Sequence, residues 1–275
     1  MNVLLKQIYS FHNWDFLLLN IMGMFIIMAI AGYVTRKNGL NLVNTSVYLA
    51  GIPIIFLLGS RLFYIVFYQL DNQINNQAVH LFDLKLYGFS IYGGLILLVL
   101  YFAVAAWFNR IPVWNWLDSH SPGLVGYVAF GKTGCFVNGC CFGIPTIMPW
   151  GIHYSPEDQA YNYYIIEILD TLKSQPWQVY SDRIHPVQLY ESVIALLLLL
   201  IAMALLRKKV MPGLVFLLIT VLYSLARLGL FYLRANPETG TLYHLLPWLY
   251  FIIASLSLGV LLIKLIKLRI NIYTK

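Results

Sequence analysis

Charged side chains are scarce in this sequence. Only 11% of its 275 residues are Asp, Glu, Lys or Arg, whereas 60% are hydrophobic. A soluble domain of this length needs far more charge on its surface. The composition therefore excludes an ordinary soluble protein and indicates a chain that crosses a membrane several times.

Acidic residues and cysteines are scarcer still. The 11 Asp and Glu residues face 18 Lys and Arg residues, which gives a net charge of +7. The basic residues lie mostly at the ends of apolar runs, a pattern typical of membrane topology and not of a nucleic-acid-binding surface, so we expect no nucleic-acid partner. The three cysteines all lie within residues 135–141, which excludes a disulfide-rich framework.

Seven apolar runs are long enough to cross a hydrocarbon core of about 30 Å, which requires about 20 helical residues. They cover residues 14–35, 43–68, 89–108, 123–142, 187–206, 212–232 and 245–265. The loops after alternate runs, beginning with the first, carry most of the Lys and Arg residues, which predicts an N-out/C-in orientation by the positive-inside rule. The sequence thus predicts an all-α polytopic membrane protein with about seven transmembrane helices, in which residues 1–275 form one domain.

The connection at residues 144–186 is much longer than the usual loop between helices. It is rich in Pro, Tyr, Trp and acidic residues. Long loops of this kind are usually functional or partly folded. We therefore expect a small periplasmic head here, with a short amphipathic helix at residues 161–172.

The segment 131–143 carries the densest group of functional residue types. It places Lys132, Asn138 and the three cysteines at the end of the fourth apolar run, with glycines about one helical turn apart. Ionisable groups at membrane depth are costly, so they usually face a functional site inside the protein. Small residues at this spacing allow another helix to approach closely.

Three arginines lie in or near apolar runs: Arg61 in the second, Arg227 in the sixth and Arg234 just after it. The planar guanidinium group suits phosphate oxygens. With Lys132, these residues are predicted to form a cationic pocket for a phospholipid headgroup. The alternative for Arg61 and Arg234 is that they extend to the membrane interface from helix ends.

Two further candidate groups open the fifth and third runs. Gln188 and Glu191 are three residues apart and share a helix face, and His185 precedes them at a position suited to acid–base chemistry or headgroup contact. A capping role for His185 and an ion pair for Glu191 are equally compatible with this pattern. In the third run, Tyr92 precedes two adjacent glycines, Gly93 and Gly94, which permit close backbone approach or a local kink and are expected to contribute to substrate binding. The alternative for Tyr92 is an anchor at the membrane interface.

The three thiols are expected to point in different directions if the helix continues through them, because successive residues turn by about 100°. We therefore expect no metal site from Cys135, Cys140 and Cys141. Cysteine also packs as a small apolar residue. A nucleophilic thiolate at Cys135 or Cys140 is the alternative, since Lys132 is close in sequence.

Taken together, these motifs resemble those of the prolipoprotein diacylglyceryl transferases, bacterial membrane enzymes that lipidate the cysteine of lipoprotein precursors. Residues 131–143 resemble the signature G-R-x-G-N-F-x-N-G-E-x-x-G, and residues 185–191 closely match H-P-x-Q-L-Y-E. Residues 59–62 and 223–234 look like the family's G-x-R and Y-G-x-x-R-x-x-x-E-x-x-R stretches.

The resemblance implies transfer of a diacylglyceryl group from phosphatidylglycerol, or a similar anionic phospholipid, to the lipobox cysteine of a prolipoprotein signal peptide. It implies a multi-pass protein of the bacterial inner membrane that uses no cofactor. The matched positions it implies as site residues are Arg61, Asn138, Gly143, His185, Gln188, Glu191, Arg227 and Arg234.

This sequence departs from the family pattern at several of these motifs. Tyr92 stands where the family has a histidine, and Lys132 stands for the signature arginine. Cys135 and Cys140 replace an asparagine and a glutamate, and Phe231 replaces a second glutamate. The resemblance therefore implies a divergent member with an altered site.

Within this reading, Arg227 and Lys132, with Arg234, are expected to hold phosphate. Asn138 is expected to orient the glycerol, and Tyr92 or His185 to assist proton transfer. Two alternatives stay open. One is a related transferase with another acceptor or a cysteine nucleophile, and the other is a catalytically silent lipid-binding paralogue.

Overall fold

The computed structural model describes residues 2–69, 89–154, 160, 183–208, 210–235 and 244–273. Most of these residues belong to seven α-helices: α1 (Asn2–Lys37), α2 (Leu42–Tyr64), α3 (Ile91–Phe108), α4 (Val113–Val137), α6 (Val187–Leu206), α7 (Leu214–Phe231) and α8 (Leu246–Tyr273). A π-helical turn, Ile65–Gln69, follows α2. Within these ranges, extended backbone forms only isolated bridges, which confirms the predicted all-α class.

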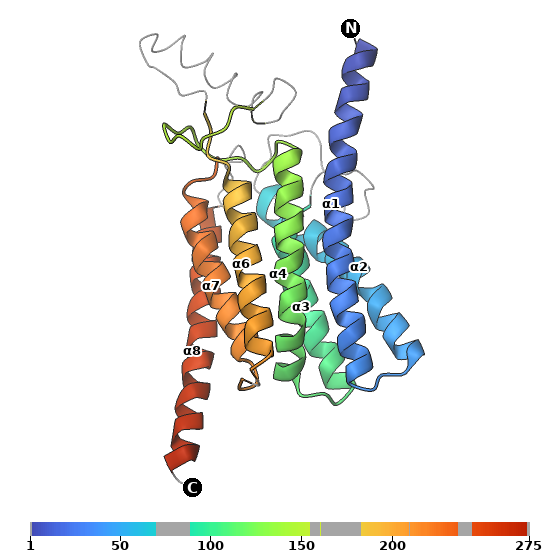
Figure 1. Cartoon of the computed structure of the whole chain (residues 1–275), viewed down its shortest axis with the longest axis vertical. Helices are drawn as coiled ribbons and strands as arrows, with labels where there is room; N and C mark the ends of the chain where they lie inside the picture. The colour runs from blue at the N-terminus through green and yellow to red at the C-terminus, as the bar shows by residue number, and fades with distance from the viewer. Residues whose placement is uncertain are drawn as a thin grey trace.

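Six of the described helices, all except α4, are long and apolar enough to cross a membrane. Their exposed surfaces are covered with large hydrophobic side chains, as expected for contact with lipid. The first and last described residues lie at opposite ends of the bundle (Figure 1). The chain is a multi-pass membrane protein.

Helix α4 lies at the centre of the bundle, where it packs against α1, α3, α6 and α7 (Figure 1). Its glycines make the closest of these contacts possible. Gly123 and Gly126 lie against Ile27 and Ile26 of α1, with no room for a larger side chain at Gly126 unless Ile26 shifts. Small residues at helix interfaces let backbones approach within a membrane.

The predicted start of the fourth span was wrong. Residues 123–142 were expected, but α4 begins at Val113 and ends at Val137. Asp118 and His120 give the first part of the helix a loop-like sequence, yet both are buried and hydrogen-bonded. Pro122, directly before the predicted run, lies inside the helix. Buried partners satisfy these polar groups, so hydropathy underestimates the length of the helix.

Partners from other helices account for the polar residues of α4. The Oη atom of Tyr48 and the Nε2 atom of His120 are 2.9 Å apart. The Asp118 carboxylate accepts hydrogen bonds from the backbone N–H groups of Gly213 and Phe216, at 2.6 and 2.8 Å. Asp118 therefore caps the N-terminus of α7, where a negative charge is favourable.

The other spans fall close to their predicted positions, and α6 coincides with residues 187–206. At the end of the bundle nearest the N-terminus, single bridges join Gly143 to Arg234 and Ile184 to both Pro145 and Ile152. These bridges tie together the segments that follow α4, precede α6 and follow α7. The predicted helix at residues 161–172 lies outside the described residues.

Candidate active site

Glu191 is the centre of a buried polar cluster formed by four helices. Its Oε1 atom accepts hydrogen bonds from the hydroxyl groups of Tyr92 on α3, at 2.7 Å, and Tyr223 on α7, at 2.6 Å. Its Oε2 atom lies 3.1 Å from both the Nζ atom of Lys132 on α4 and the Nη1 atom of Arg227 on α7. The predicted ion pair of Glu191 with a buried arginine is confirmed.

This cluster carries more positive than negative charge. Lys132 and Arg227 share the single carboxylate of Glu191, and all three side chains are at most 4% exposed. Among the described residues, no other carboxylate pairs with either cation. Uncompensated charge inside a membrane is costly, and an anionic ligand relieves it.

Arg227 is held between two aromatic rings. Its guanidinium carbon lies 4.5 Å from the ring centroid of Tyr92 and 5.3 Å from that of Tyr250. Its Nη2 atom also donates a hydrogen bond to the Tyr250 hydroxyl at 3.3 Å. The Nε atom of Arg227 is buried and has no hydrogen-bond partner within the described part of the chain. This N–H donor of Arg227 is therefore not satisfied by the described residues.

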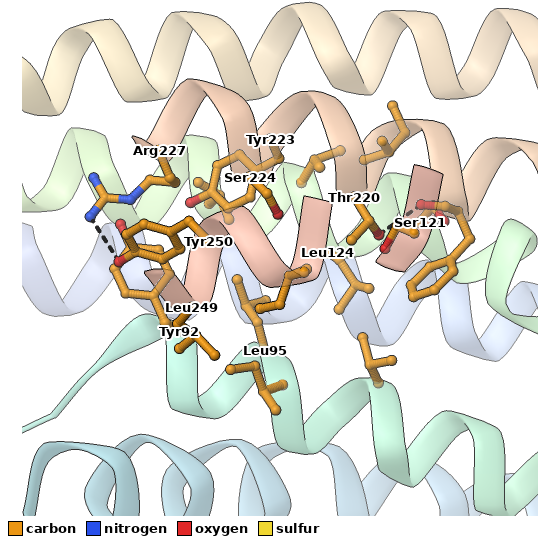
Figure 2. Close-up of a pocket in the computed structure, with 18 of the residues that line it drawn as sticks. Tyr92, Leu95, Ser121, Leu124, Thr220, Tyr223, Ser224, Arg227, Leu249 and Tyr250 are labelled. Carbon is orange, nitrogen blue, oxygen red and sulfur yellow. Dashed lines mark hydrogen bonds between the residues drawn. The ribbon is translucent and has the colours of Figure 1, made fainter. Parts of the chain in front are cut away.

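A cavity of about 320 Å³ extends from this cluster between α3, α4, α7 and α8. Figure 2 shows Arg227, Tyr92 and Tyr250 at one end and Thr220 and Ser121 at the other. Leu95 and Leu124 lie between the two ends (Figure 2), and the lining is mostly aliphatic, with Val99, Val128 and Ile219 among its other residues. The cavity thus joins a cationic end to an apolar channel, which suits an amphipathic ligand with an anionic headgroup.

Two adjacent glycines fix Tyr92 beside the cations. A Cβ atom on Gly93 would overlap the backbone of Gly59 on α2, and one on Gly94 would lie 2.5 Å from the Ser60 hydroxyl. The predicted close backbone approach at these glycines is confirmed. Because α3 begins at Ile91, this packing sets the position of Tyr92 in its first turn.

The other predicted site residues lie outside the Glu191 cluster. Arg61 is buried and its guanidinium carbon lies 4.0 Å from the Phe89 ring centroid. His185 is partly buried, with its Nδ1 atom 3.1 Å from the Tyr190 hydroxyl. Burial lowers the pKa of His185, which favours its neutral imidazole. Asn138 is the C-cap residue directly after the last residue of α4.

Gln188, Gly143 and Arg234 belong to a second group at the end of α4. The Nε2 atom of Gln188 donates a hydrogen bond to the backbone oxygen of Cys140 at 2.7 Å. Gly143 is bridged to Arg234, and the Nη2 atom of Arg234 lies 3.4 Å from the Cys141 sulfur. A Cβ atom on Gly143 would lie 2.5 Å from the His185 backbone oxygen, so this position requires glycine.

The prediction that the three thiols diverge was wrong. The sulfur atoms of Cys135, Cys140 and Cys141 all lie within 4.8 Å of one another. The prediction extended the helix through all three residues, whereas α4 ends at Val137 and the chain then turns back. Gly139 and Cys141 take positive φ angles of 63° and 59° in this turn.

The sequence is that of a known membrane enzyme family. A sequence model of a protein family, described as prolipoprotein diacylglyceryl transferase, matches residues 5–268. The chain belongs to this family. The residues around Glu191 come from α3, α4, α6 and α7, four of the helices in which the sequence resembles the family.

Individual proteins with this name are also similar to the chain in sequence. A phosphatidylglycerol–prolipoprotein diacylglyceryl transferase of Clostridium tetani is 31% identical over 186 residues, which cover 66% of this chain and 65% of the relative. A relative with the same name from Tropheryma whipplei is 29% identical over 196 residues, which cover 69% of this chain and 65% of the relative. The matched part of this chain thus spans slightly less than two thirds of either relative.

Two residues of the site were not singled out by the sequence. Tyr223 donates to the same carboxylate oxygen as Tyr92, and Tyr250 contacts Arg227. Tyr223 lies four residues before Arg227, and so on the same helix face, which is a signal that could have identified it. Tyr250 lies on α8, away from every motif, and its role follows only from the packing of α8 against α7.

Proposed function

We propose that this protein transfers a diacylglyceryl group from phosphatidylglycerol to the thiol of a lipobox cysteine in the bacterial inner membrane. The observation that carries this proposal is the excess positive charge of the cluster in which Lys132 and Arg227 share Glu191, with Arg227 lining one end of an apolar cavity. A phospholipid places its phosphate and its acyl chains in this same arrangement. The family and the names of the relatives support the same reaction.

The phosphate of the donor is assigned to Arg227 and Lys132. Glu191 holds both cations in place, and the unpaired Nε atom of Arg227 provides a donor for a phosphate oxygen. The acyl chains extend along the cavity past Leu95 and Leu124. When the bond between glycerol carbon and phosphate oxygen breaks, the two cations stabilise the negative charge on the departing glycerol phosphate.

Tyr92 is the residue assigned to proton transfer. Its hydroxyl donates to Glu191 at 2.7 Å and its ring contacts both cations, whereas none of the contacts described for His185 reaches this cluster. The phenol oxygen can accept a proton from the incoming thiol while its own proton passes to Glu191. This relay takes the place of the histidine that the family motif has at this position.

The membrane topology is also part of the proposal. We assign seven crossings, with α4 as the central one, and an N-out/C-in orientation. The opposite positions of the termini support an odd number of crossings (Figure 1). Arg36 and Lys37 end α1, and basic residues also follow α6 and lie near the end of α8, all at the end of the bundle predicted to be inside. Residues 144–186 are then a periplasmic head.

The transfer reaction is tested with purified protein, phosphatidylglycerol labelled in its acyl chains and a lipobox peptide. The expected product is a diacylglyceryl adduct on the peptide cysteine, detected by mass spectrometry. Arg227→Gln is expected to abolish the adduct, and Arg110→Gln, in the exposed loop between α3 and α4, serves as the matched control. Folded protein that binds phosphatidylglycerol but forms no peptide adduct would contradict the proposal.

A further inference from the structure

The turn after α4 brings the three cysteines of the chain together. The N–H of Gly139 donates to the carbonyl oxygen of Phe136, and the N–H of Cys140 donates to that of Cys135, both at 3.1 Å. With the positive φ angle of Gly139, these bonds define a Schellman motif. In this motif the side chains at the positions of Cys135 and Cys140 face each other. The positive φ angle of Cys141 turns the third thiol toward the other two.

The spacing of the sulfur atoms fits a shared metal ion better than a disulfide. All three lie within 4.8 Å of one another. Three thiolates around a tetrahedral zinc ion, with Zn–S bonds of about 2.3 Å, are roughly 3.8 Å apart. A disulfide requires a separation of about 2.0 Å and joins only two of the three sulfurs.

The surroundings of the thiols favour negative charge and allow an ion to enter. The Nη2 atom of Arg234 lies 3.4 Å from the Cys141 sulfur, and a neighbouring cation stabilises a thiolate. Cys135 is buried, whereas Cys140 and Cys141 are partly exposed. Gln188 holds the turn through the backbone oxygen of Cys140. The backbone of the turn is therefore held by Gln188, while the partly exposed thiols of Cys140 and Cys141 can be reached from outside the protein.

We propose that Cys135, Cys140 and Cys141 bind a zinc ion through three thiolates and leave its fourth coordination position open. Three protein ligands with one open position are the arrangement of catalytic zinc sites, whereas structural sites are closed by four. The thiol cluster also differs in sequence from the family signature, which has asparagine and glutamate at the positions of Cys135 and Cys140. The site is therefore a property of this chain.

The open position has a consequence that rests on the proposed function. A thiol loses its proton when it binds zinc, so the lipobox cysteine would bind as a thiolate, and its proton would pass to the relay of Tyr92 and Glu191 that the proposed function assigns. Its sulfur then forms a bond to the glycerol carbon of the donor. The bond between this carbon and the phosphate oxygen breaks, and the electron pair leaves with glycerol phosphate. Lys132, which binds this phosphate, lies one helical turn before Cys135 on α4.

The zinc site is tested first without any substrate. The full chain is purified in detergent, supplied with zinc and dialysed, and its metal content is measured by mass spectrometry. About one zinc ion per chain is expected. Replacing zinc by cobalt is expected to give a thiolate-to-cobalt charge-transfer band, and bound zinc is expected to protect all three thiols from alkylation.

Single Cys→Ser substitutions at each of the three positions are expected to remove the zinc and the cobalt band. Ser119→Ala, a partly exposed position near the other end of α4, serves as the control for handling and folding. Arg234→Gln is expected to weaken zinc binding by about tenfold while leaving the thiols intact. Size-exclusion behaviour and phosphatidylglycerol binding show that each variant is folded.

Three results would overturn the site: three free thiols without zinc, a disulfide between two of them in place of zinc, or zinc binding that survives Cys135→Ser. The transferase assay is then run with the zinc-loaded protein and after chelation. Loss of transfer on chelation, with phosphatidylglycerol binding retained, supports the role of the open position. A zinc-loaded protein that transfers nothing would overturn the proposed function and leave the metal site established.

Discussion

The carboxylate of Glu191 on α6 lies 3.1 Å from the guanidinium of Arg227 on α7, and both side chains are 2% exposed. Lys132 shares the same oxygen atom at the same distance. One carboxylate therefore positions two cations from two different helices. This arrangement leaves one excess positive charge, and the first two predictions are based on it.

Replacing Glu191 by Gln should destabilise the protein. The substitution preserves shape but leaves Lys132 and Arg227 buried without a counter-charge, which costs about 3–5 kcal/mol. Thermal unfolding in detergent measures the effect. Asp15→Asn, an exposed carboxylate on α1, should change little. Anionic phospholipid should restore part of the lost stability, and zwitterionic phospholipid should not. Equal rescue by both lipids would argue against an anion site.

Arg227→Lys should weaken phosphatidylglycerol binding although it keeps the charge. Lysine cannot reach Glu191 and Tyr250 at once or present the planar fork that binds phosphate. Loss of one charge-assisted hydrogen bond costs about 1.5–3 kcal/mol, which corresponds to roughly 10- to 100-fold in affinity. Lipid titration by native mass spectrometry measures this change. Unchanged affinity would place the phosphate elsewhere.

Tyr92→Phe and Tyr223→Phe form a matched pair for the proton relay. Both hydroxyls donate to the Oε1 atom of Glu191, so each substitution removes one similar hydrogen bond. If Tyr92 transfers the proton, Tyr92→Phe should lower kcat by about 10²- to 10⁴-fold with little change in KM for phosphatidylglycerol. Tyr223→Phe should have a much smaller effect. Equal losses in the two variants would reduce Tyr92 to a positioning role.

Gly93→Ala should impair the enzyme by moving α3 away from α2. The added Cβ atom would overlap the backbone of Gly59, so Tyr92 would be displaced from Arg227. Both thermal stability and transfer rate should fall. Gly229→Ala on α7 is the control, because nothing lies within 4 Å of the added atom. That substitution should stabilise the helix slightly, by at most about 1 kcal/mol.

Leu95→Trp should reduce the space available to acyl chains. Leu95 lines the cavity between its cationic and far ends (Figure 2). The larger ring should weaken binding of long-chain phosphatidylglycerol more than that of short-chain phosphatidylglycerol. Leu197→Trp on the exposed face of α6 adds the same bulk outside the cavity. Comparable losses for both chain lengths would show that the chains do not enter this cavity.

The sequence predicted the helices well because apolar length alone identifies a membrane span. The spans other than α4 fall close to their predicted ranges. Helix α4 was misplaced because its polar residues find partners on other helices, as Asp118 does on α7. Those partners are distant in sequence, so no local pattern reveals them.

The sequence predicted which residues belong to the site better than it predicted which of them contact one another. Charged residues inside apolar runs identified Lys132, Glu191 and Arg227, and the structure joins these three through one carboxylate. The grouping of the cysteines could not be predicted in the same way. It depends on where α4 ends and on the left-handed angle at Cys141, which is unusual for a residue other than glycine.

Asp118 and Glu191 hold α7 at two separate points along its length. Asp118 binds the backbone at Gly213 and Phe216, where the helix begins, and Glu191 binds Arg227 near its other end. At 1.5 Å per residue, these points are roughly 20 Å apart. Helix α7 is therefore fixed near both of its ends. Loss of the hydrogen bonds of Asp118 would let α7 tilt and move Arg227 away from Glu191. A substitution at Asp118 is therefore expected to weaken the proposed phosphate site although it lies at the opposite end of the helix.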